Sequence, residues 1–459
     1  MQTRKLFGTD GMRGKAGHYP LDQGTVFKFG KAVGRLLQKK MESSDRPQVV
    51  LGEDTRESGR EISRVLAAGI RSTGTRLFYA GVITTPGVAF LTRHHNFTAG
   101  IMVSASHNPY YDNGIKVFTN SGLKLSEAQE LEIERAISDD QAQDGEYPQD
   151  ELSPEPEFLQ EYVAYLRGIL PANLPLPKEP LVVDCANGSA SRVAPLLLKD
   201  VGIDARILNA APDGRNINLH CGSLHPASMA REAQAANAYL GVAFDGDADR
   251  AIFATRDGRI ADGDHVLYAA APCYERLRKL EGHTVVGTLM TNLALEHALA
   301  RCGIGLKRTA VGDRYVLEEM LRSGYNLGGE PSGHIIFADL SLAGDGIITL
   351  LQILRILGET GASFIEAVGG LKQYPQVICN IPVREKRPLE SIPEVSRTIE
   401  ACSRELGDAG RIVVRYSGTE ALARVMVEAQ DASAVEHYAA RITRAIEAAI
   451  GATAGTQAH

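Results

Sequence analysis

Residues 181–208, LVVDCANGSASRVAPLLLKDVGIDARIL, contain the pattern that decides the fold. The segment opens with an apolar run at 181–184, which is typical of a buried strand. Residues 192–199 follow with helical spacing, end near Gly202 and lead to a second apolar run at 205–208. A strand, an amphipathic helix closed by glycine and a second strand make a βαβ unit, which implies a parallel or mixed sheet.

The same pattern occurs twice more along the chain. One copy has a strand at 49–51, a helix at 61–72 and a strand at 76–79, and the other has them at 284–287, 293–301 and 306–310. Any α/β chain supplies some such triplets by chance. We nevertheless favour a true repeat and expect three related α/β domains in series, because the spacing between copies is far longer than a solenoid period.

At 459 residues the chain is too long for a single hydrophobic core. Clusters of proline mark joints, and after residue 370 the repeat is replaced by strands at 376–383 and 411–415 and a closing helix at 432–450. We therefore expect α/β domains at 1–153, 154–254 and 255–370, each with a mixed sheet. A smaller α+β domain should follow at 371–450, with a disordered tail at 451–459.

The composition excludes several classes of protein. A net charge of −7 argues against binding nucleic acid, which needs a basic face. The longest apolar segment, residues 347–357, is interrupted by Gln352 and Arg355 and is too short for a membrane span, which needs about 20 residues. The six scattered cysteines form no Cys-x-x-Cys pair, and the N-terminus lacks the apolar core of a signal peptide. We expect a cytoplasmic protein with free thiols.

A serine loop is the first candidate site. Ser106 follows the apolar run 100–103, so it lies at a strand end, where α/β folds place ligands. His107, Asn108 and, ten residues on, Lys116 add polar groups that so short a loop does not need for folding. A capping serine in an ordinary turn is the structural alternative.

An acidic loop is the second candidate. Asp245, Asp247 and Asp249 alternate directly after the strand 240–244, and such carboxylates repel one another unless a cation lies among them. Oxygen ligands suit a hard ion such as Mg²⁺. A calcium-binding helix-loop-helix is excluded because Arg250 and Arg256 stand where that loop needs glycine and glutamate. A solvated acidic turn is the remaining alternative.

Two further loops are polar and rich in glycine. Residues 328–334, GGEPSGH, offer a carboxylate and a hydroxyl suited to sugar hydroxyl groups, although Gly328 and Gly329 could form a mere turn. Residues 415–420, RYSGTE, together with Arg424 combine two guanidinium groups with two hydroxyls. Such a set binds a phosphate dianion without a metal, and a surface turn with salt-bridged arginines is the alternative.

Taken in order, these loops resemble the four active-site loops of the α-D-phosphohexomutase superfamily. Residues 104–118 resemble its phosphoserine loop, 245–250 its metal loop, 330–334 its sugar loop and 415–428 its phosphate loop. Residues 7–14, FGTDGMRG, resemble the N-terminal signature of its bacterial phosphoglucosamine mutase subfamily. The resemblance covers essentially the whole chain and implies four domains that each contribute one loop to a central cleft.

The resemblance implies an intramolecular phosphotransferase of the isomerase class. It would interconvert glucosamine 6-phosphate and glucosamine 1-phosphate, on the way to the amino-sugar precursor of the cell wall. The active enzyme would carry phosphate on Ser106 and pass through glucosamine 1,6-bisphosphate, the implied intermediate and activator. The implied partner is a phosphorylated amino sugar, and neither nucleic acid nor a membrane is expected as a partner. Whether the protein forms a homodimer is left open.

The resemblance also assigns residues. One Mg²⁺ per chain would bind Asp245, Asp247, Asp249 and an oxygen of phosphorylated Ser106, where it would neutralise charge on the transferring group. The implied catalytic residues are Ser106, His107, Lys116, Arg13, Arg250 and His334. Which of Lys116, His334 and Arg13 moves the proton stays open. The implied substrate-binding residues are Glu330, Ser332, Arg415, Ser417, Gly418, Thr419 and Arg424. Their hold on the non-reacting phosphate must release when the intermediate turns, which predicts a mobile fourth domain.

Three rival functions remain. A phosphomannomutase or phosphoglucomutase would share the chemistry and differ in the sugar. A metal-dependent phosphatase would carry its phosphate on Asp245 instead of Ser106. A phosphosugar-binding regulator would bind the substrate without turning it over, but every motif that a degenerate copy might lose is present.

Overall fold

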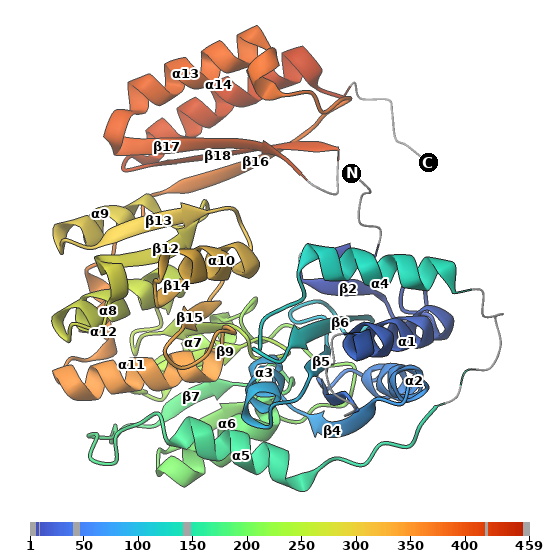
Figure 1. Ribbon diagram of the computed structural model, residues 1–459. Helices are drawn as coiled ribbons and strands as arrows, with labels where there is room; N and C mark the ends of the chain where they lie inside the picture. The colour runs from blue at the N-terminus through green and yellow to red at the C-terminus, as the bar shows by residue number, and fades with distance from the viewer. Residues whose placement is uncertain are drawn as a thin grey trace. The chain divides into compact units, whose positions relative to one another are not determined.

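The computed structural model describes residues 6–8, 10–39, 46–140, 147, 149–417 and 421–452. The chain forms two compact units, Met1–Thr288 with Leu306–Gly369 and Leu289–Gly305 with Gly370–His459. Helices cover the sheets in both units (Figure 1). We describe each unit by itself.

The first sheet is mixed and has six strands in the order β1-β2-β6-β5-β3-β4. Strand β3 pairs in parallel with β4 and β5, and β6 runs antiparallel to β5. The strands are β1 (Phe7–Gly8), β2 (Gly11–Lys15), β3 (Gln48–Glu53), β4 (Arg76–Val82), β5 (Ala99–Val103) and β6 (Asp112–Thr119). The helices are α1 (Gln23–Lys39), α2 (Gly59–Arg71), α3 (Thr85–His94) and α4 (Glu127–Asp139).

The second and third sheets have five and four strands, in the orders β11-β10-β9-β7-β8 and β13-β12-β14-β15. The second comprises β7 (Leu181–Asp184), β8 (Ala205–Leu208), β9 (Gly241–Phe244), β10 (Ala251–Ala254) and β11 (Ile260–Ala261), with helices α5 (Pro156–Arg167), α6 (Ala190–Val201) and α7 (Ala227–Ala235). The third comprises β12 (Thr284–Thr288), β13 (Gly305–Thr309), β14 (Leu327–Gly329) and β15 (Ile335–Phe337), with helices α8 (Gly263–Arg276), α9 (Leu293–Arg301), α10 (Asp313–Ser323), α11 (Gly346–Thr360) and α12 (Phe364–Gly369).

The three sheets share one topology, which confirms the predicted repeat. Their matching orders are β4-β3-β5-β6, β8-β7-β9-β10 and β13-β12-β14-β15. In each, a parallel pair (β3 with β5, β7 with β9, β12 with β14) is followed by an antiparallel strand. The serine, acidic and sugar loops therefore leave their sheets at equivalent points, between β5 and β6, β9 and β10, and β14 and β15.

Residues 181–208 show why these units form. All four residues of β7 are buried, as expected for a parallel strand covered on both faces. Helix α6 buries Val193 and Leu197 on one side, and it ends at Gly202, whose φ of 81° favours glycine. The second sheet continues to Ala261, past the expected boundary at residue 254, because β11 folds back antiparallel on β10.

The fourth sheet is antiparallel, in the order β16-β18-β17. Its strands are β16 (Gln376–Pro382), β17 (Gly410–Tyr416) and β18 (Leu422–Ala429). Helices α13 (Pro393–Leu406) and α14 (Ala432–Ile450) lie together on one face (Figure 1) and form a core with alternate residues of β18, Ala423, Val425 and Val427. This alternation shows that most of the stretch 415–428, expected to be a loop, is strand.

Two parts of the chain differ from expectation, namely the start of the C-terminal tail and helix α9. Gly451 and Ala452, expected in a disordered tail, extend α14 toward β16, where the Ala452 N–H donates to the Pro382 carbonyl. The rest of that tail, 453–459, lies outside the described residues. Helix α9 belongs to the second compact unit, where the Leu293 N–H contacts the Glu428 carboxylate.

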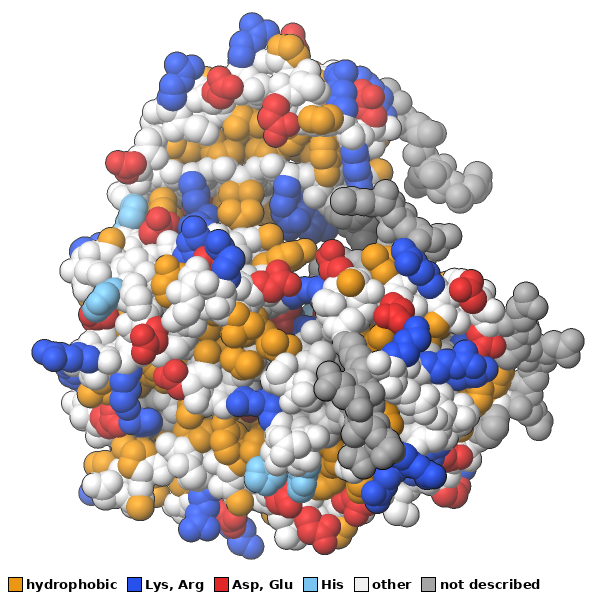
Figure 2. All heavy atoms as spheres, in the orientation of Figure 1, with side chains coloured by type: hydrophobic (Ala, Val, Ile, Leu, Met, Phe, Trp, Pro, Cys, Tyr) orange, Lys and Arg blue, Asp and Glu red, His pale blue; other side chains and the backbone are white. Residues whose placement is uncertain are grey.

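Two features of the structure concern membranes and nucleic acid as partners. Among the described residues, every helix is too short or too polar to serve as a membrane span. On the face shown in Figure 2, lysine and arginine side chains are interspersed with acidic ones, so this face is not uniformly basic.

Candidate functional site

The serine and acidic loops meet although they belong to different sheets. Ser106 is buried, and its φ of 54° holds it in the left-handed region. Its hydroxyl donates to Asp245 Oδ2 at 2.7 Å, and its Oγ lies 3.2 Å from His107 Nδ1. A non-glycine residue in this backbone region persists only where the surroundings fix it, and such positions cluster at functional sites.

The surroundings that fix the serine loop come from the end of β3. The Arg56 guanidinium is fully buried and donates to the carbonyls of Ser106 at 2.9 Å and Asn108 at 2.8 Å. Asp54 binds Arg56 Nε at 2.9 Å and accepts a 2.6 Å hydrogen bond from Ser104. Neither residue was predicted from the sequence. The signal was available, because β3 is the parallel neighbour of β5 and their carboxyl ends share an edge.

The three aspartates form a buried ligand set. Carboxylate oxygens of Asp245, Asp247 and Asp249 all lie within 4.8 Å of one another. The Oδ1 atoms of Asp247 and Asp249 are buried, and neither has a hydrogen-bond partner in the described part of the chain. Burial raises the pKa of Asp245 well above its usual range, and the other two carboxylates raise it further. Unsatisfied buried carboxylate oxygens that repel one another fit Mg²⁺, which takes hard oxygen ligands.

One cation and one hydroxyl hold the middle aspartate in place. Asp247 Oδ2 accepts hydrogen bonds from Thr85 Oγ1 at 2.5 Å and from Lys116 Nζ at 2.9 Å. Thr85 is the first residue of α3, and its N–H also binds the Asp247 carbonyl at 3.0 Å. Asp247 is thus held by two elements of the first domain, α3 and β6.

A closed ring of alternating charges, which we call the charge ring, joins the three repeated domains. Charged atoms of successive members lie 2.6–3.8 Å apart, and the one remaining pair, Asp10 with Lys124, is also in contact. The ring runs through Asp10, Lys124, Asp313, His334, Asp249 and Lys116, and back to Asp10. The first domain supplies three members, the second one and the third two.

The ring favours the charged form of all its members. Burial opposes each charge, but the neighbours outweigh it. The pKa values of the three carboxylates are therefore lowered, and those of the two lysines and of His334 are raised. Lys116 therefore keeps its proton and the protonated form of His334 is favoured, so both are suited to donating a proton or stabilising negative charge.

Three more predicted residues lie around the serine. Arg13 pairs with Asp10 and donates to Asn108 Oδ1 at 3.4 Å. Burial, with help from Arg250 and Arg13, lowers the pKa of His107 to about 4, which makes it a neutral imidazole at pH 7. The Arg250 N–H donates to Asp245 Oδ1 at 3.2 Å, and its guanidinium lies 3.8 Å from Asp249.

The sugar loop brings a further carboxylate to this region. Glu330 is buried, and its Oε1 accepts the Gly312 N–H at 3.0 Å. Burial raises the pKa of Glu330. Ser332 is exposed, whereas His334 is buried in the charge ring. Beside the ring lies a cavity of about 320 Å³, lined in part by Lys124, Asp249, Asp313 and His334.

The predicted phosphate-binding residues belong to the second compact unit. Arg415 on β17 and Arg424 on β18 stand directly opposite each other in register, so both side chains leave the same face of the sheet. Ser417 follows β17 and is buried, and Lys386 Nζ donates to its carbonyl at 2.7 Å. Gly418 and Thr419 lie outside the described residues.

Comparison with known proteins gives matches along the chain. Four domain families match in order: phosphoglucomutase/phosphomannomutase alpha/beta/alpha domains I, II and III at residues 4–144, 160–258 and 262–374, and the C-terminal domain at 379–445. The chain is 48% identical to a phosphoglucosamine mutase of Koribacter versatilis, with 98% of both chains covered. It is 46% identical to one of Solibacter usitatus, covering 98% of this chain and 99% of the relative.

Solved structures show the same fold at lower identity. A phosphoglucomutase/phosphomannomutase family protein from Burkholderia thailandensis superposes with a TM-score of 0.79 at 24% identity, with 98% of both chains covered. An Aspergillus fumigatus N-acetylphosphoglucosamine mutase, solved in complex with GlcNAc-6P and magnesium, superposes with a TM-score of 0.63 at 21% identity. That match covers 90% of this chain and 85% of the fungal one.

Proposed function

The chain belongs to the phosphoglucomutase/phosphomannomutase family, and we propose that it interconverts glucosamine 6-phosphate and glucosamine 1-phosphate. The observation that carries this proposal is the 48% and 46% identity, over 98% of the chain, to relatives named phosphoglucosamine mutase. The enzyme is then a mutase of the isomerase class. Its substrate is a phosphorylated amino sugar.

Ser106 is the proposed phosphate carrier. Its phosphorylated Oγ donates the phosphoryl group to the free hydroxyl of the substrate. The Oγ–P bond breaks, a bond from phosphorus to the sugar oxygen forms, and the proton of that hydroxyl ends on Ser106 Oγ. The resulting glucosamine 1,6-bisphosphate reorients within the site, and its other phosphate is transferred to Ser106. The 2.7 Å contact of Ser106 with Asp245 supports this role because it puts the hydroxyl beside the ligand set.

The acidic loop is the proposed magnesium site. Asp245, Asp247 and Asp249 would hold one Mg²⁺ per chain, together with an oxygen of the phosphoserine. When bound, the ion neutralises negative charge on the phosphoryl oxygens, which is a large part of catalysis in phosphoryl transfer. The buried, unsatisfied Oδ1 atoms of Asp247 and Asp249 support the assignment.

The charge ring and the second unit supply the remaining roles. Lys116 and His334, whose protonated forms are favoured, are the proposed groups that give a proton to the leaving sugar oxygen or stabilise its charge, and Arg13 adds positive charge beside the serine. Glu330 and Ser332 bind sugar hydroxyls. The non-reacting phosphate is bound by Arg415, Ser417, Gly418, Thr419 and Arg424. Their release of that phosphate predicts movement of the fourth domain during each turnover.

A coupled assay with glucosamine 6-phosphate, glucose 6-phosphate and mannose 6-phosphate tests the proposal. We expect the highest kcat/KM with the glucosamine substrate, and intact-mass analysis to show one phosphate that is lost in Ser106→Ala together with turnover. Ser323→Ala, which removes an exposed hydroxyl from the end of α10, is the matched control. Undiminished turnover in Ser106→Ala would refute the carrier, and a clear preference for glucose or mannose phosphate would refute the substrate.

A further inference from the structure

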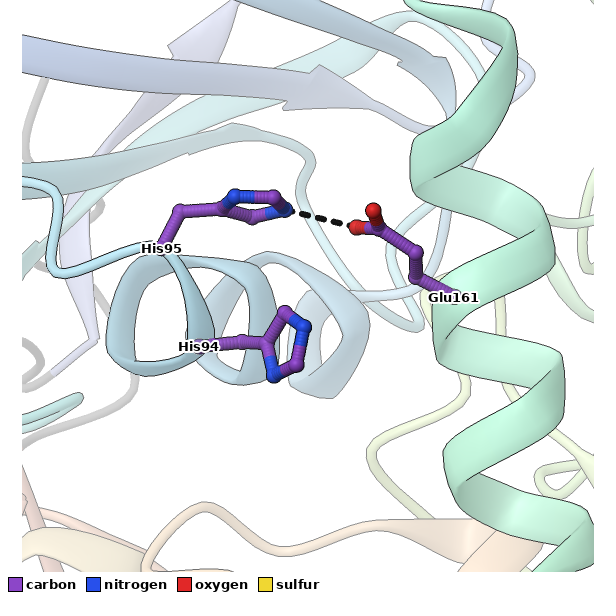
Figure 3. A group of neighbouring side chains, drawn as sticks. All are labelled: His94, His95 and Glu161. Carbon is purple, nitrogen blue, oxygen red and sulfur yellow. Dashed lines mark hydrogen bonds and ion pairs between the residues drawn. The ribbon is translucent and has the colours of Figure 1, made fainter.

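A second group of metal-binding side chains lies outside the site described above. His94 and His95 end α3, and Glu161 lies on the neighbouring helix α5. One ligand atom from each of the three residues lies within 4.8 Å of the other two. Figure 3 shows the three side chains in the space between the helices, with the hydrogen bond of His95 to Glu161 dashed.

Small movements would bring the three groups to metal-binding distances. A tetrahedral ion with bonds of about 2.0–2.1 Å needs ligand atoms about 3.3 Å apart. His95 Nε2 and Glu161 Oε2 now lie 2.6 Å apart, so they would separate by well under an ångström. His94 is exposed, and its ring lies 5.0 Å from that of His95 and stacks 5.1 Å from that of Phe90. Turning of this ring toward the ion would therefore exchange the stacking contact for a metal bond.

The donor set selects the kind of ion. Two imidazole nitrogens and one carboxylate oxygen suit Zn²⁺ and similar transition ions, whereas Mg²⁺ takes oxygen ligands. Since His94 faces solvent, water can fill the fourth position. The side chains of His95 and Glu161 are only 31% and 32% exposed. The His95 ring also packs 5.1 Å from Phe158 and 5.3 Å from Phe97, which fixes its orientation.

The position on the helix favours a cation. His94 and His95 lie at the C-terminal end of α3, where the helix dipole is negative. The opposite end of the same helix begins at Thr85, which binds Asp247. An ion at the C-terminal end would therefore fasten α3 to α5 and steady the helix that holds the acidic loop.

The geometry points to a zinc-type site formed by His94, His95 and Glu161, separate from the aspartate site and independent of the proposed function. Its occupation stabilises the α3–α5 contact. It does not take part in the chemistry, because none of its three residues touches the serine, the aspartates or the charge ring in the contacts described.

The test uses the full-length protein saturated with Mg²⁺, so that the aspartates are occupied. Zn²⁺ is titrated by calorimetry, and Co²⁺ is titrated while its visible spectrum is recorded. We expect one additional ion per chain, a Co²⁺ spectrum typical of tetrahedral coordination, and a higher thermal unfolding midpoint with Zn²⁺. His94→Ala, His95→Gln and Glu161→Gln should each weaken Zn²⁺ binding by at least about tenfold, because loss of even an outer-shell partner costs 10–100-fold.

His283→Gln is the matched control. His283 Nδ1 lies 2.8 Å from Glu275 Oε1, so it forms the same kind of pair, but it belongs to no three-residue ligand group among the described residues. We expect it to leave Zn²⁺ binding unchanged, and all four variants to keep mutase turnover in Mg²⁺. Zn²⁺ binding that is absent from the Mg²⁺-loaded protein, or that survives undiminished in His94→Ala and Glu161→Gln, would overturn the proposal.

Discussion

Replacing Lys124 by methionine removes one cation from the charge ring and keeps most of the side-chain volume. Lys124 Nζ lies 2.6 Å from Asp313 Oδ2 and also contacts Asp10, and its side chain is 20% exposed. Removing one partner of a buried ion pair typically costs about 3–5 kcal/mol. We expect about 2–3 kcal/mol here, because Asp10 keeps Lys116 and Asp313 keeps His334.

This cost is measurable by calorimetry. At about 2.1 cal/mol/K per residue, the compact unit that carries Lys124 has an unfolding entropy of roughly 0.7 kcal/mol/K, so the unfolding midpoint should fall by about 3–4 °C. Turnover should fall by about tenfold, since the ring positions Lys116 and His334 and small displacements of such groups are costly.

Two further variants test whether the charge ring causes the loss of stability in Lys124→Met. Lys39→Met removes an exposed pair with Glu132, whose side chains are 70% and 44% exposed, and should cost less than about 1 kcal/mol. Adding Asp313→Asn to Lys124→Met removes an uncompensated carboxylate and should recover part of the lost stability. A Lys124→Met variant that is no less stable than Lys39→Met, with no coupling in the double variant, would refute a stabilising role of the ring.

Three more predictions concern pH, metal and phosphate. Burial raises the pKa of Asp345 to about 6 despite its hydrogen bond from Tyr162. The folded state therefore holds this proton more tightly, and about 3 kcal/mol of stability present below pH 4 is lost as the pH rises through 6. Asp345→Asn should lose this component, so its thermal midpoint should rise relative to the wild type between pH 4 and 7, and parallel curves would contradict the assignment. Chelation of Mg²⁺ should abolish turnover reversibly. Asp247→Asn should raise the Mg²⁺ concentration that gives half-maximal rate by at least about tenfold. Rates measured over a series of Mg²⁺ concentrations test this, and an unchanged half-maximal concentration would contradict it. Arg424→Gln should raise KM about tenfold or more by removing a charge-assisted hydrogen bond to the non-reacting phosphate, and an unchanged KM would argue against that contact.

Local patterns in the sequence predicted the sheets and the loops. Apolar runs such as 181–184 and 284–287 are strands because they are short, β-branched and followed by helical spacing. The polar loops after β5 and β9 leave different sheets, so their proximity was implied by the family resemblance, which gives each domain one loop in a central cleft. The hydrogen bond of Ser106 to Asp245 bears out that proximity.

Local sequence patterns did not predict the charge ring. Lys124 and Asp313 are separated by 189 residues, and both lie in segments with no distinctive local pattern. Such a contact depends on how two domains dock, which no periodicity of 2 or 3.6 residues encodes. The stretch 415–428 differs for another reason. The family resemblance made it a loop, whereas Val425 and Val427 of β18 pack into the core at the period of a strand.

The three equivalent loops of the repeated domains are the tips of antiparallel hairpins. A hairpin whose two strands are already paired tolerates new residues at its tip, because the ladder of hydrogen bonds beneath is untouched. The proposed nucleophile, metal ligands and sugar contacts thus lie on three separate tips. A new sugar preference could arise by substitution of residues 330–332 alone, with the serine, the aspartates and His334 left in place.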